Sequence, residues 1–438
     1  MTDLLAARWL FGLSLAFHIV FAAIGVAMPA FMVVAEWRHR RTGDPVLLEL
    51  ARRWAKGSAI LFAVGAVSGT VISFELGLLW PRFMELAGPA VGLAFALEGF
   101  AFFGEAIFLG LYLYGWDRVG PRLHLASGVV VAVCGAVSAF FVTLANAWMA
   151  VPAGFRLDGG RVVDVEPLVA MFPPGWAHEV LHVVLSCYVA TGFGVAGIHA
   201  LALLRDPGNR FHRAALRVVL GVGGLAALAM PLSGDLSARE VAEVQPRKLA
   251  ALEGQFRTER GAPLRIGGLP DVDAGETRYA LEVPYGLSLL AFHDPHAVVK
   301  GLEEFPRDTW PPVAKVHLAF QVMVGLGTLL ALLAALHFLT VLRRREHPRW
   351  LLGALGVAAP LGVVALEAGW LVTEWGRQPY AAVGLLRTAD AVTPVGNLGL
   401  PLAAFTVVYL FLTAVVIGLL RRQVAHAPTS AELREVEA

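Results

Sequence analysis

The sequence predicts an all-α fold, a polytopic membrane helix bundle with nine transmembrane helices. Hydrophobic residues make up 57% of the 438 residues and charged residues only 16%, against roughly 25% charged in typical soluble domains. Apolar residues gather in nine stretches, each long enough to cross about 30 Å of hydrocarbon as a helix. Arginine gathers in alternate connections between these stretches, which is typical of a multi-pass membrane protein.

Helices are expected because lipid offers no hydrogen bonds to an unpaired backbone. The first stretch is too long for a signal-peptide core and has no basic leader, so we expect it to be a membrane span. The nine predicted spans, in order, cover about residues 8–36, 54–80, 90–115, 124–150, 177–204, 214–235, 314–342, 349–375 and 398–421.

Arginine placement orients the predicted bundle. The connections after the first, third, fifth and seventh spans, and the segment after the ninth, carry most of the arginine between spans. Basic connections stay on the cytoplasmic side. We therefore expect the N-terminus outside and the C-terminus inside.

Four segments follow from this arrangement. Residues 1–235 hold the first six helices, 236–313 form a long outer loop, 314–422 hold the last three helices, and 423–438 form a cytoplasmic tail. The net charge of +1, with no long basic run, argues against nucleic-acid binding. Two cysteines in apolar stretches exclude a disulfide framework and a covalent haem motif.

Ionisable residues inside the spans are candidates for a functional site, because burying a charge in lipid is costly. Glu98 and Glu105 lie seven residues apart, close to two helical turns, and so share one face. With the predicted orientation, five side chains from five helices lie in the outer half of the bilayer: His18, Glu98, His182, Met323 and Glu374. This common depth predicts cofactors in the bundle core, and a histidine with a methionine is a low-spin haem ligand set.

Simpler interpretations remain open for each residue alone. A single histidine in a span often hydrogen-bonds a neighbouring helix. Glu374 could pair with Arg377, and Met323 could be ordinary packing. We expect Glu75 to be an interface residue, and His317 and His337 to be structural.

Two other functions compete. Residues 178–182 read HEVLH, the H-E-x-x-H pattern of zinc metallopeptidases, in which two histidines bind zinc and the glutamate is a general base. An intramembrane metallopeptidase would need a third ligand, and no later span offers an obvious one. A proton-coupled transporter would suit the intramembrane carboxylates, but the sequence shows no two-half symmetry.

Several motifs resemble subunit I of the cytochrome bd quinol oxidases. The most specific is GWLVTEWGRQP at residues 369–379, which is similar to the family signature G-W-x-x-x-E-x-G-R-Q-P. The family's quinol-binding loop begins like residues 245–253, and its paired-glutamate helix resembles residues 98–105. Residues 146–149 and 323–327 also match, so the resemblance extends over the whole chain.

The resemblance implies a terminal oxidase that oxidises membrane quinol and reduces O2 to water. It implies a low-spin b haem on His182 and Met323, and two high-spin haems, a second b and a d-type, served by His18, Glu98 and Glu374. Which high-spin haem uses which residues stays open. The resemblance assigns the remaining roles as follows: Trp370 between haems, Arg377 near a propionate, Lys248 and Glu253 at quinol, and Glu105 and Ser138 on the proton route from inside.

Partners and place in the cell also follow from the resemblance. It implies a second large membrane subunit, a small single-span subunit, and location in the cell inner (plasma) membrane. The chain departs from the family pattern where Gln321 replaces a common arginine and Tyr380 a tryptophan, and in its short outer loop.

Overall fold

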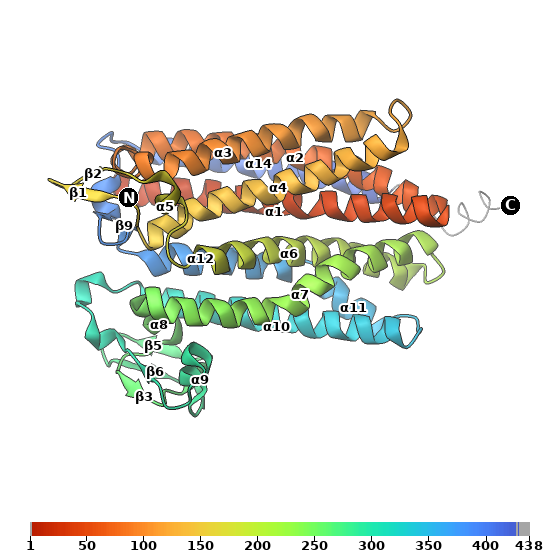
Figure 1. The fold of residues 1–438 in the computed structure, drawn as a ribbon. Coiled ribbons are helices and arrows are strands. Elements are labelled where there is room, and N and C mark those ends of the chain that lie inside the picture. Colours follow the sequence, from red (N-terminus) through yellow and green to blue (C-terminus); the bar gives the residue numbers. More distant parts are fainter. Residues whose placement is uncertain (1, 426–427, 429–438) are drawn as a thin grey trace.

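Long apolar helices lie side by side along one axis in the computed structural model, which describes residues 2–425 and residue 428 (Figure 1). Within that described part, nine helical segments are long and apolar enough to cross a membrane, which confirms the predicted bundle. They are α1 (Asp3–Thr42), α2 (Pro45–Leu79), α3 (Pro81–Tyr114), α4 (Pro121–Ala150), α6 (Trp176–Arg205), α7 (Arg210–Val244), α10 (Val313–Leu342), α11 with α12 (Arg349–Ala358 and Leu361–Arg377), and α14 (Gly399–Ala425).

The helices are longer than the predicted spans because hydropathy locates the apolar window and not the helix ends. α1 begins at Asp3 and ends at Thr42, where Gly43 adopts a left-handed conformation (φ 73°) that stops the helix. α7 continues to Val244, past the predicted end at residue 235. α2, α3 and α4 each begin with a proline, which suits the first helical turn because that position needs no donor.

The eighth span, predicted at 349–375, is found at Arg349–Arg377 but contains a break. It is divided at Ala359 and Pro360 into α11 and α12. Proline has no N–H to donate to the preceding turn, which accounts for the break. α12 then carries the GWLVTEWGRQP motif to its end at Arg377.

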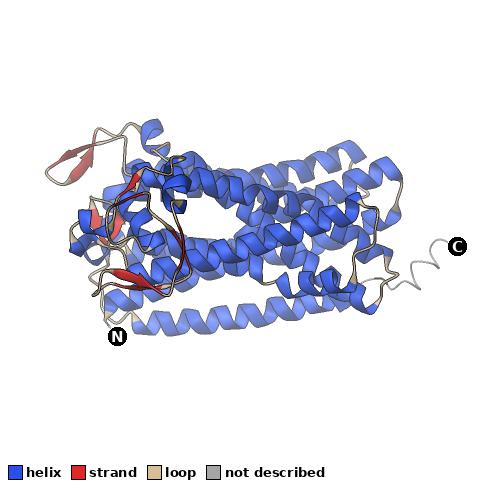
Figure 2. Cartoon of the chain, turned by 90° about the horizontal axis from the view of Figure 1, so that it is seen from below, coloured by secondary structure: helices blue, strands red, loops and turns tan. Residues whose placement is uncertain are grey.

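Short elements gather at the end of the bundle where the N-terminus lies (Figures 1 and 2). Five two-stranded antiparallel pairs are described: β1–β2, β3–β8, β4–β7, β5–β6 and β9–β10. Their bounds are β1 Arg156–Asp158, β2 Arg161–Val163, β3 Glu259–Arg260, β4 Leu264–Ile266, β5 Leu269–Asp271, β6 Glu276–Arg278, β7 Leu281–Val283, β8 Val298–Val299, β9 Tyr380–Ala382 and β10 Leu386–Arg387. The short helices are α5 (Pro167–Met171), α8 (Pro246–Glu253), α9 (Gly286–Phe292) and α13 (Thr388–Ala391), with 3-10 turns η1 (Leu302–Glu304) and η2 (Arg307–Thr309).

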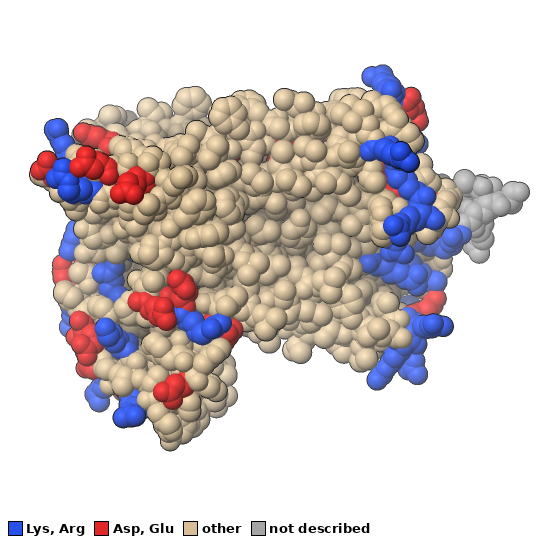
Figure 3. Space-filling model, viewed as in Figure 1, with Lys and Arg blue, Asp and Glu red and all other residues tan. Residues whose placement is uncertain are grey.

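The largest hydrophobic core joins α1, α2, α6, α7, α10 and α11. α6 and α7 cross closely because both have glycine there: a Cβ on Gly223 would lie 2.9 Å from Gly192 Cα. The two ends of the bundle differ in charge (Figure 3). The end opposite the short elements shows mostly Lys and Arg, whereas the end that carries the short elements mixes both signs. Of the tail predicted at 423–438, α14 covers the start to Ala425, and 426–427 and 429–438 lie outside the described residues.

Candidate functional site

His18 is held in one tautomer by the neighbouring helix. Its Nδ1 lies 3.0 Å from Ser68 Oγ on α2. The Ser68 hydroxyl lies 2.9 Å from Val64 O and 3.1 Å from Gly65 O, and a carbonyl can only accept. Because the hydroxyl proton is used there, Ser68 accepts from His18 Nδ1–H. The lone pair of His18 therefore lies on Nε2, the atom that remains to bind a metal.

His182 and Met323 lie on helices of one packed group, formed by α6, α7, α10 and α12. His182 Nδ1 lies 3.1 Å from Ser233 Oγ on α7, and this contact orients the ring. Met323 faces α12, where a Cβ on Gly369 would lie 3.1 Å from its Sδ. The missing side chain of Gly369 is what leaves room for the thioether.

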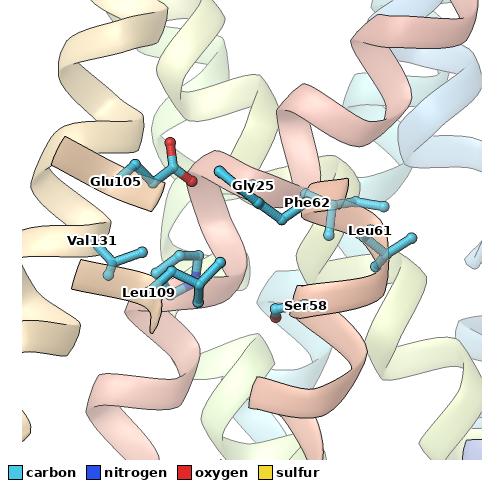
Figure 4. Close-up of a pocket in the computed structure, with 9 residues that line it drawn as sticks. Gly25, Ser58, Leu61, Phe62, Glu105, Leu109 and Val131 are labelled. Atoms are coloured by element: carbon cyan, nitrogen blue, oxygen red, sulfur yellow. The ribbon is translucent and has the colours of Figure 1, made fainter. Parts of the chain in front are cut away.

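Glu98 and Ser138 are brought together between α3 and α4, with Ser138 Oγ donating to Glu98 Oε1 at 3.2 Å. Glu105 lies two turns further along α3 and is buried (6% exposed). It borders a cavity of ≈ 10 Å³ whose wall includes Gly25 and Ser58 (Figure 4). That volume is about the room that one water needs.

Glu374 and Arg377 form the polar end of α12. Glu374 Oε1 accepts from Asn146 Nδ2 at 2.9 Å, and its Oε2 accepts from Arg377 Nη2 at 2.6 Å. The simpler interpretation, in which Glu374 pairs with Arg377, is therefore confirmed. Nε and Nη1 of the buried Arg377 nevertheless have no hydrogen-bond partner. A buried guanidinium with free donors fits an anionic group such as a carboxylate.

Trp370 lies on the same helix, one turn before Glu374. It packs against a small core that includes Ile19 of α1 and Cys187 of α6. Ile19 directly follows His18 in the chain, so Trp370 occupies the region between the α1 side and the α6 side of the bundle. This position is compatible with a place between two cofactors.

Lys248 and Glu253 are both buried on the short helix α8 (8% and 1% exposed). Burial lowers the pKa of Lys248. The nearby carboxylates of Glu179 and Glu374 act in the opposite direction, and the positive charge of Arg377 lowers this pKa further. Burial raises the pKa of Glu253 to about 8, against the attraction of Arg265. A carboxyl group with that pKa exchanges its proton near neutral pH, as a proton acceptor for a substrate must.

Gln321 fastens the long loop that precedes α10 to that helix. Its Nε2 donates to Arg265 O at 3.0 Å, and its Oε1 accepts from Gly267 N at 2.9 Å. One turn earlier, His317 places its two ring nitrogens 2.7 Å from Leu252 O and 2.9 Å from Gly267 O. His317 thus has the structural role expected of it, and Gln321 fastens the loop by hydrogen bonds to its backbone.

Two further buried carboxylates were not selected from the sequence. Glu75, expected as an interface residue, is 5% exposed; its Oε1 accepts from Ser14 Oγ at 2.8 Å and its Oε2 has no partner. Glu367 on α12 also has a buried oxygen without a partner. A signal existed for Glu367: it lies seven residues before Glu374, the spacing that separates Glu98 from Glu105.

The H-E-x-x-H segment does not acquire the third ligand that zinc requires. His178 and His182 lie one turn apart on α6, and Nδ1 of His178 is buried without a partner. Within residues 2–425, no group of three or more His, Cys, Asp or Glu side chains is close enough together to hold a metal ion. A zinc peptidase site is therefore not formed by the described part of the chain.

Comparison with known proteins gives one consistent result. A family model described as cytochrome bd terminal oxidase subunit I matches residues 6–428. The chain is 39% identical to the Bacillus subtilis (strain 168) protein named "Putative cytochrome bd menaquinol oxidase subunit I", with 100% of both chains covered. It is 32% identical to the cytochrome bd ubiquinol oxidase subunit 1 of the same organism, over 97% of this chain and 94% of that protein.

A solved structure agrees. The structure of the bd oxidase from Geobacillus thermodenitrificans matches with a TM-score of 0.92 and 41% sequence identity, over 98% of this chain and 99% of that chain.

Ser68→Ala tests the orientation of His18. Losing the acceptor of Nδ1–H should weaken metal binding through Nε2 by roughly 10- to 100-fold, as for other partners of metal-binding histidines. We expect lower haem occupancy, measured by haem extraction and absorption spectra. Ser73→Ala is the matched control, because Ser73 Oγ bonds only Gly69 O of the same helix. Equal haem content in both variants would contradict the assigned tautomer.

Proposed function

The chain belongs to the cytochrome bd terminal oxidase subunit I family, and we propose that its bundle holds one low-spin and two high-spin haems on the side chains described above. Membership makes it a subunit of a quinol oxidase of the respiratory chain, located in the plasma membrane. The family implies haem and a complex with other oxidase subunits. The observation that carries the proposal is that ligand-type side chains on separate helices are each positioned by a neighbouring helix.

His182 and Met323 are the residues that would hold the low-spin b haem. The packing of α6 and α10 around α7 and α12 supports this pair, and so does the space left at Gly369. Bound haem supplies one-electron transfer, and an iron with an open position supplies oxygen chemistry. Ser233 would keep the His182 ring in the orientation that binding needs.

His18, Glu98 and Glu374 are assigned to the two high-spin haems, one of b type and one of d type. His18 presents Nε2, while Glu98 and Glu374 each have one carboxylate oxygen hydrogen-bonded to Ser138 and Asn146 respectively. The free donors of Arg377 suit a haem propionate. Trp370, which packs against the small core around Ile19 and Cys187, would lie between the haems.

Residues 236–313 are proposed as the quinol-binding loop. Lys248 would hold a quinol oxygen by hydrogen bonding, and Glu253 would take a proton from it, since a pKa of about 8 suits proton exchange at neutral pH. Both residues lie on α8, which packs against α10 and α12. Gln321 and His317 hold the following strands in place.

Protons for water formation would enter from the inside and pass Glu105, Ser138 and Glu98. The cavity beside Glu105 and the bond between Ser138 and Glu98 support this order. The basic end of the bundle supports the N-terminus-outside orientation, which places quinol proton release outside. A second large membrane subunit and a small single-span subunit are the proposed partners.

Met323→Leu tests the low-spin assignment. Leucine keeps the apolar packing but offers no sulfur, so the low-spin absorption bands should disappear while the high-spin bands remain. Quinol-dependent oxygen consumption should fall at least about tenfold. Met230→Leu, on α7 beside the main core, is the control. A low-spin spectrum that survives Met323→Leu would remove Met323 as a ligand.

Glu105→Gln tests the proton route. The amide has the shape of the carboxyl but exchanges no proton, so turnover should fall roughly 100-fold, the low end of the loss for a positioned proton carrier. Haem content should stay normal, as read from absorption spectra. Glu49→Gln, at a surface pair with Arg53, is the control. Full oxygen consumption in Glu105→Gln would exclude Glu105 from the route.

A further inference from the structure

Three buried titratable side chains meet where α1, α3 and α4 pack near the basic end of the bundle. Glu36, Tyr112 and His124 are each at most 1% exposed. None of them has a part in the haem, quinol or proton assignments above. Such burial is costly for polar groups, so their arrangement needs an explanation.

The two contacts of the His124 ring require a second proton besides the one on Nε2. Its Nε2 lies 2.9 Å from the backbone oxygen of Tyr112, which can only accept, so Nε2 carries a hydrogen. Its Nδ1 lies 3.0 Å from Glu36 Oε1. If neither atom of this second contact carried a proton, two acceptors would face each other. The Glu36–His124 pair therefore holds one proton between its two members.

This pair has a connection to the inner surface. Arg40, one turn after Glu36, donates from Nε at 3.0 Å and from Nη2 to the same Oε1, and its side chain is 26% exposed. The guanidinium stabilises Glu36 as a carboxylate when the shared proton leaves. The charged and titratable groups that face Glu36 are thus Arg40 from α1, Tyr112 from α3 and His124 from α4.

The second carboxylate oxygen of Glu36 lies on the side of Tyr112. Oε2 of Glu36 and the hydroxyl of Tyr112 are both buried and lack hydrogen-bond partners. The two groups are electrostatic neighbours. A hydroxyl in this position can accept a proton on one side and give one up on the other.

α3 leads from Tyr112 to Glu105. The two residues are seven apart, so they share one face and are separated by about 10 Å along the axis. Glycines of α4 with the same spacing lie against them. A Cβ on Gly128 would lie 2.7 Å from the Tyr112 ring, and a Cβ on Gly135 would lie 3.6 Å from Glu105 Oε2.

The cavity beside Glu105 has a free acceptor. Pro29 lies inside α1 and has no N–H for the carbonyl of Gly25, four residues earlier. Gly25 and Pro29 both line this cavity, together with Ser58 (Figure 4). A backbone carbonyl and a hydroxyl next to Glu105 are the partners that a buried water requires.

We propose that Glu36 and His124 form a proton-loading site at the inner face that supplies Glu105. A proton from the inner solvent is held between His124 Nδ1 and Glu36. It passes to the Tyr112 oxygen as the Tyr112 hydroxyl gives its own proton to water on the Glu105 side. That proton reaches Glu105 through water in the cavity, whose wall includes Leu109, three residues before Tyr112 on α3. One proton enters and one arrives, and no other bond changes. This inference rests on the proposed role of Glu105.

A purely structural role is the alternative, in which the cluster only ties three helices together. Glu36→Gln distinguishes the proton-loading role from the structural role. The amide keeps the shape of the side chain and can donate to His124 Nδ1, but it cannot carry the exchanged proton. The test uses the complete oxidase complex in lipid vesicles, with oxygen consumption, proton uptake and absorption spectra measured between pH 6 and 9.

Glu36→Gln should lower turnover and proton uptake at least about tenfold, with a larger loss at high pH, where protons are scarce. Haem content and the quinol KM should not change. His212→Asn is the matched control, because it breaks another buried inner contact, 2.8 Å from His199, that includes no carboxylate. That variant should keep normal turnover.

Normal turnover and proton uptake in Glu36→Gln would overturn the inference. If Glu36→Gln fails to assemble, Tyr112→Phe is the deciding variant, because it keeps the ring and removes only the hydroxyl. Slower proton uptake in Tyr112→Phe would support the relay, and normal uptake would overturn it. A slow Glu105→Gln beside a normal Glu36→Gln would refute the loading site alone. Normal rates in both would refute the proposed route through Glu105.

Discussion

The constraint on which this structure depends is that lipid cannot solvate a polar group. The polar side chains proposed as ligands therefore have fixed partners on neighbouring helices: Ser68 for His18, Ser233 for His182, Ser138 for Glu98 and Asn146 for Glu374. These bonds set the ring and carboxylate orientations before any cofactor binds. Preorganisation of this kind is what the proposed haem ligands would need.

The groups that lack a partner are equally informative, because buried polar atoms are nearly always hydrogen-bonded. Free donors on Arg377 lie where an anionic group would be bound. A free oxygen on Glu253 lies in the loop proposed to bind quinol. Glu36 and Tyr112 have free oxygens near the basic end, where protons would enter. In the proposed function, quinol binding, electron transfer and proton entry would occupy successive depths along the helices.

Much of this was predictable from the sequence, and the failures have identifiable causes. The nine spans followed from hydropathy, because a stretch of about twenty apolar residues has the length and composition of a membrane-crossing helix. The break at Pro360 was missed because hydropathy does not report the loss of one backbone hydrogen-bond donor at a proline. Ser68 and Ser233 could not be selected, since a serine in a helix gives no sign of which neighbour it binds. Glu36 and His124 were missed because they lie near basic helix ends, where polar residues are ordinary.

The central claim is that side chains from separate helices together hold several haems within this chain. The most direct measurement is a reduced-minus-oxidised absorption spectrum of the purified complex, with pyridine extraction to identify each porphyrin. The account predicts a low-spin b signal, a high-spin b signal and a d-type signal. Folded, quinol-binding material without haem absorption would contradict it, and a single haem per complex would refute the three-site assignment.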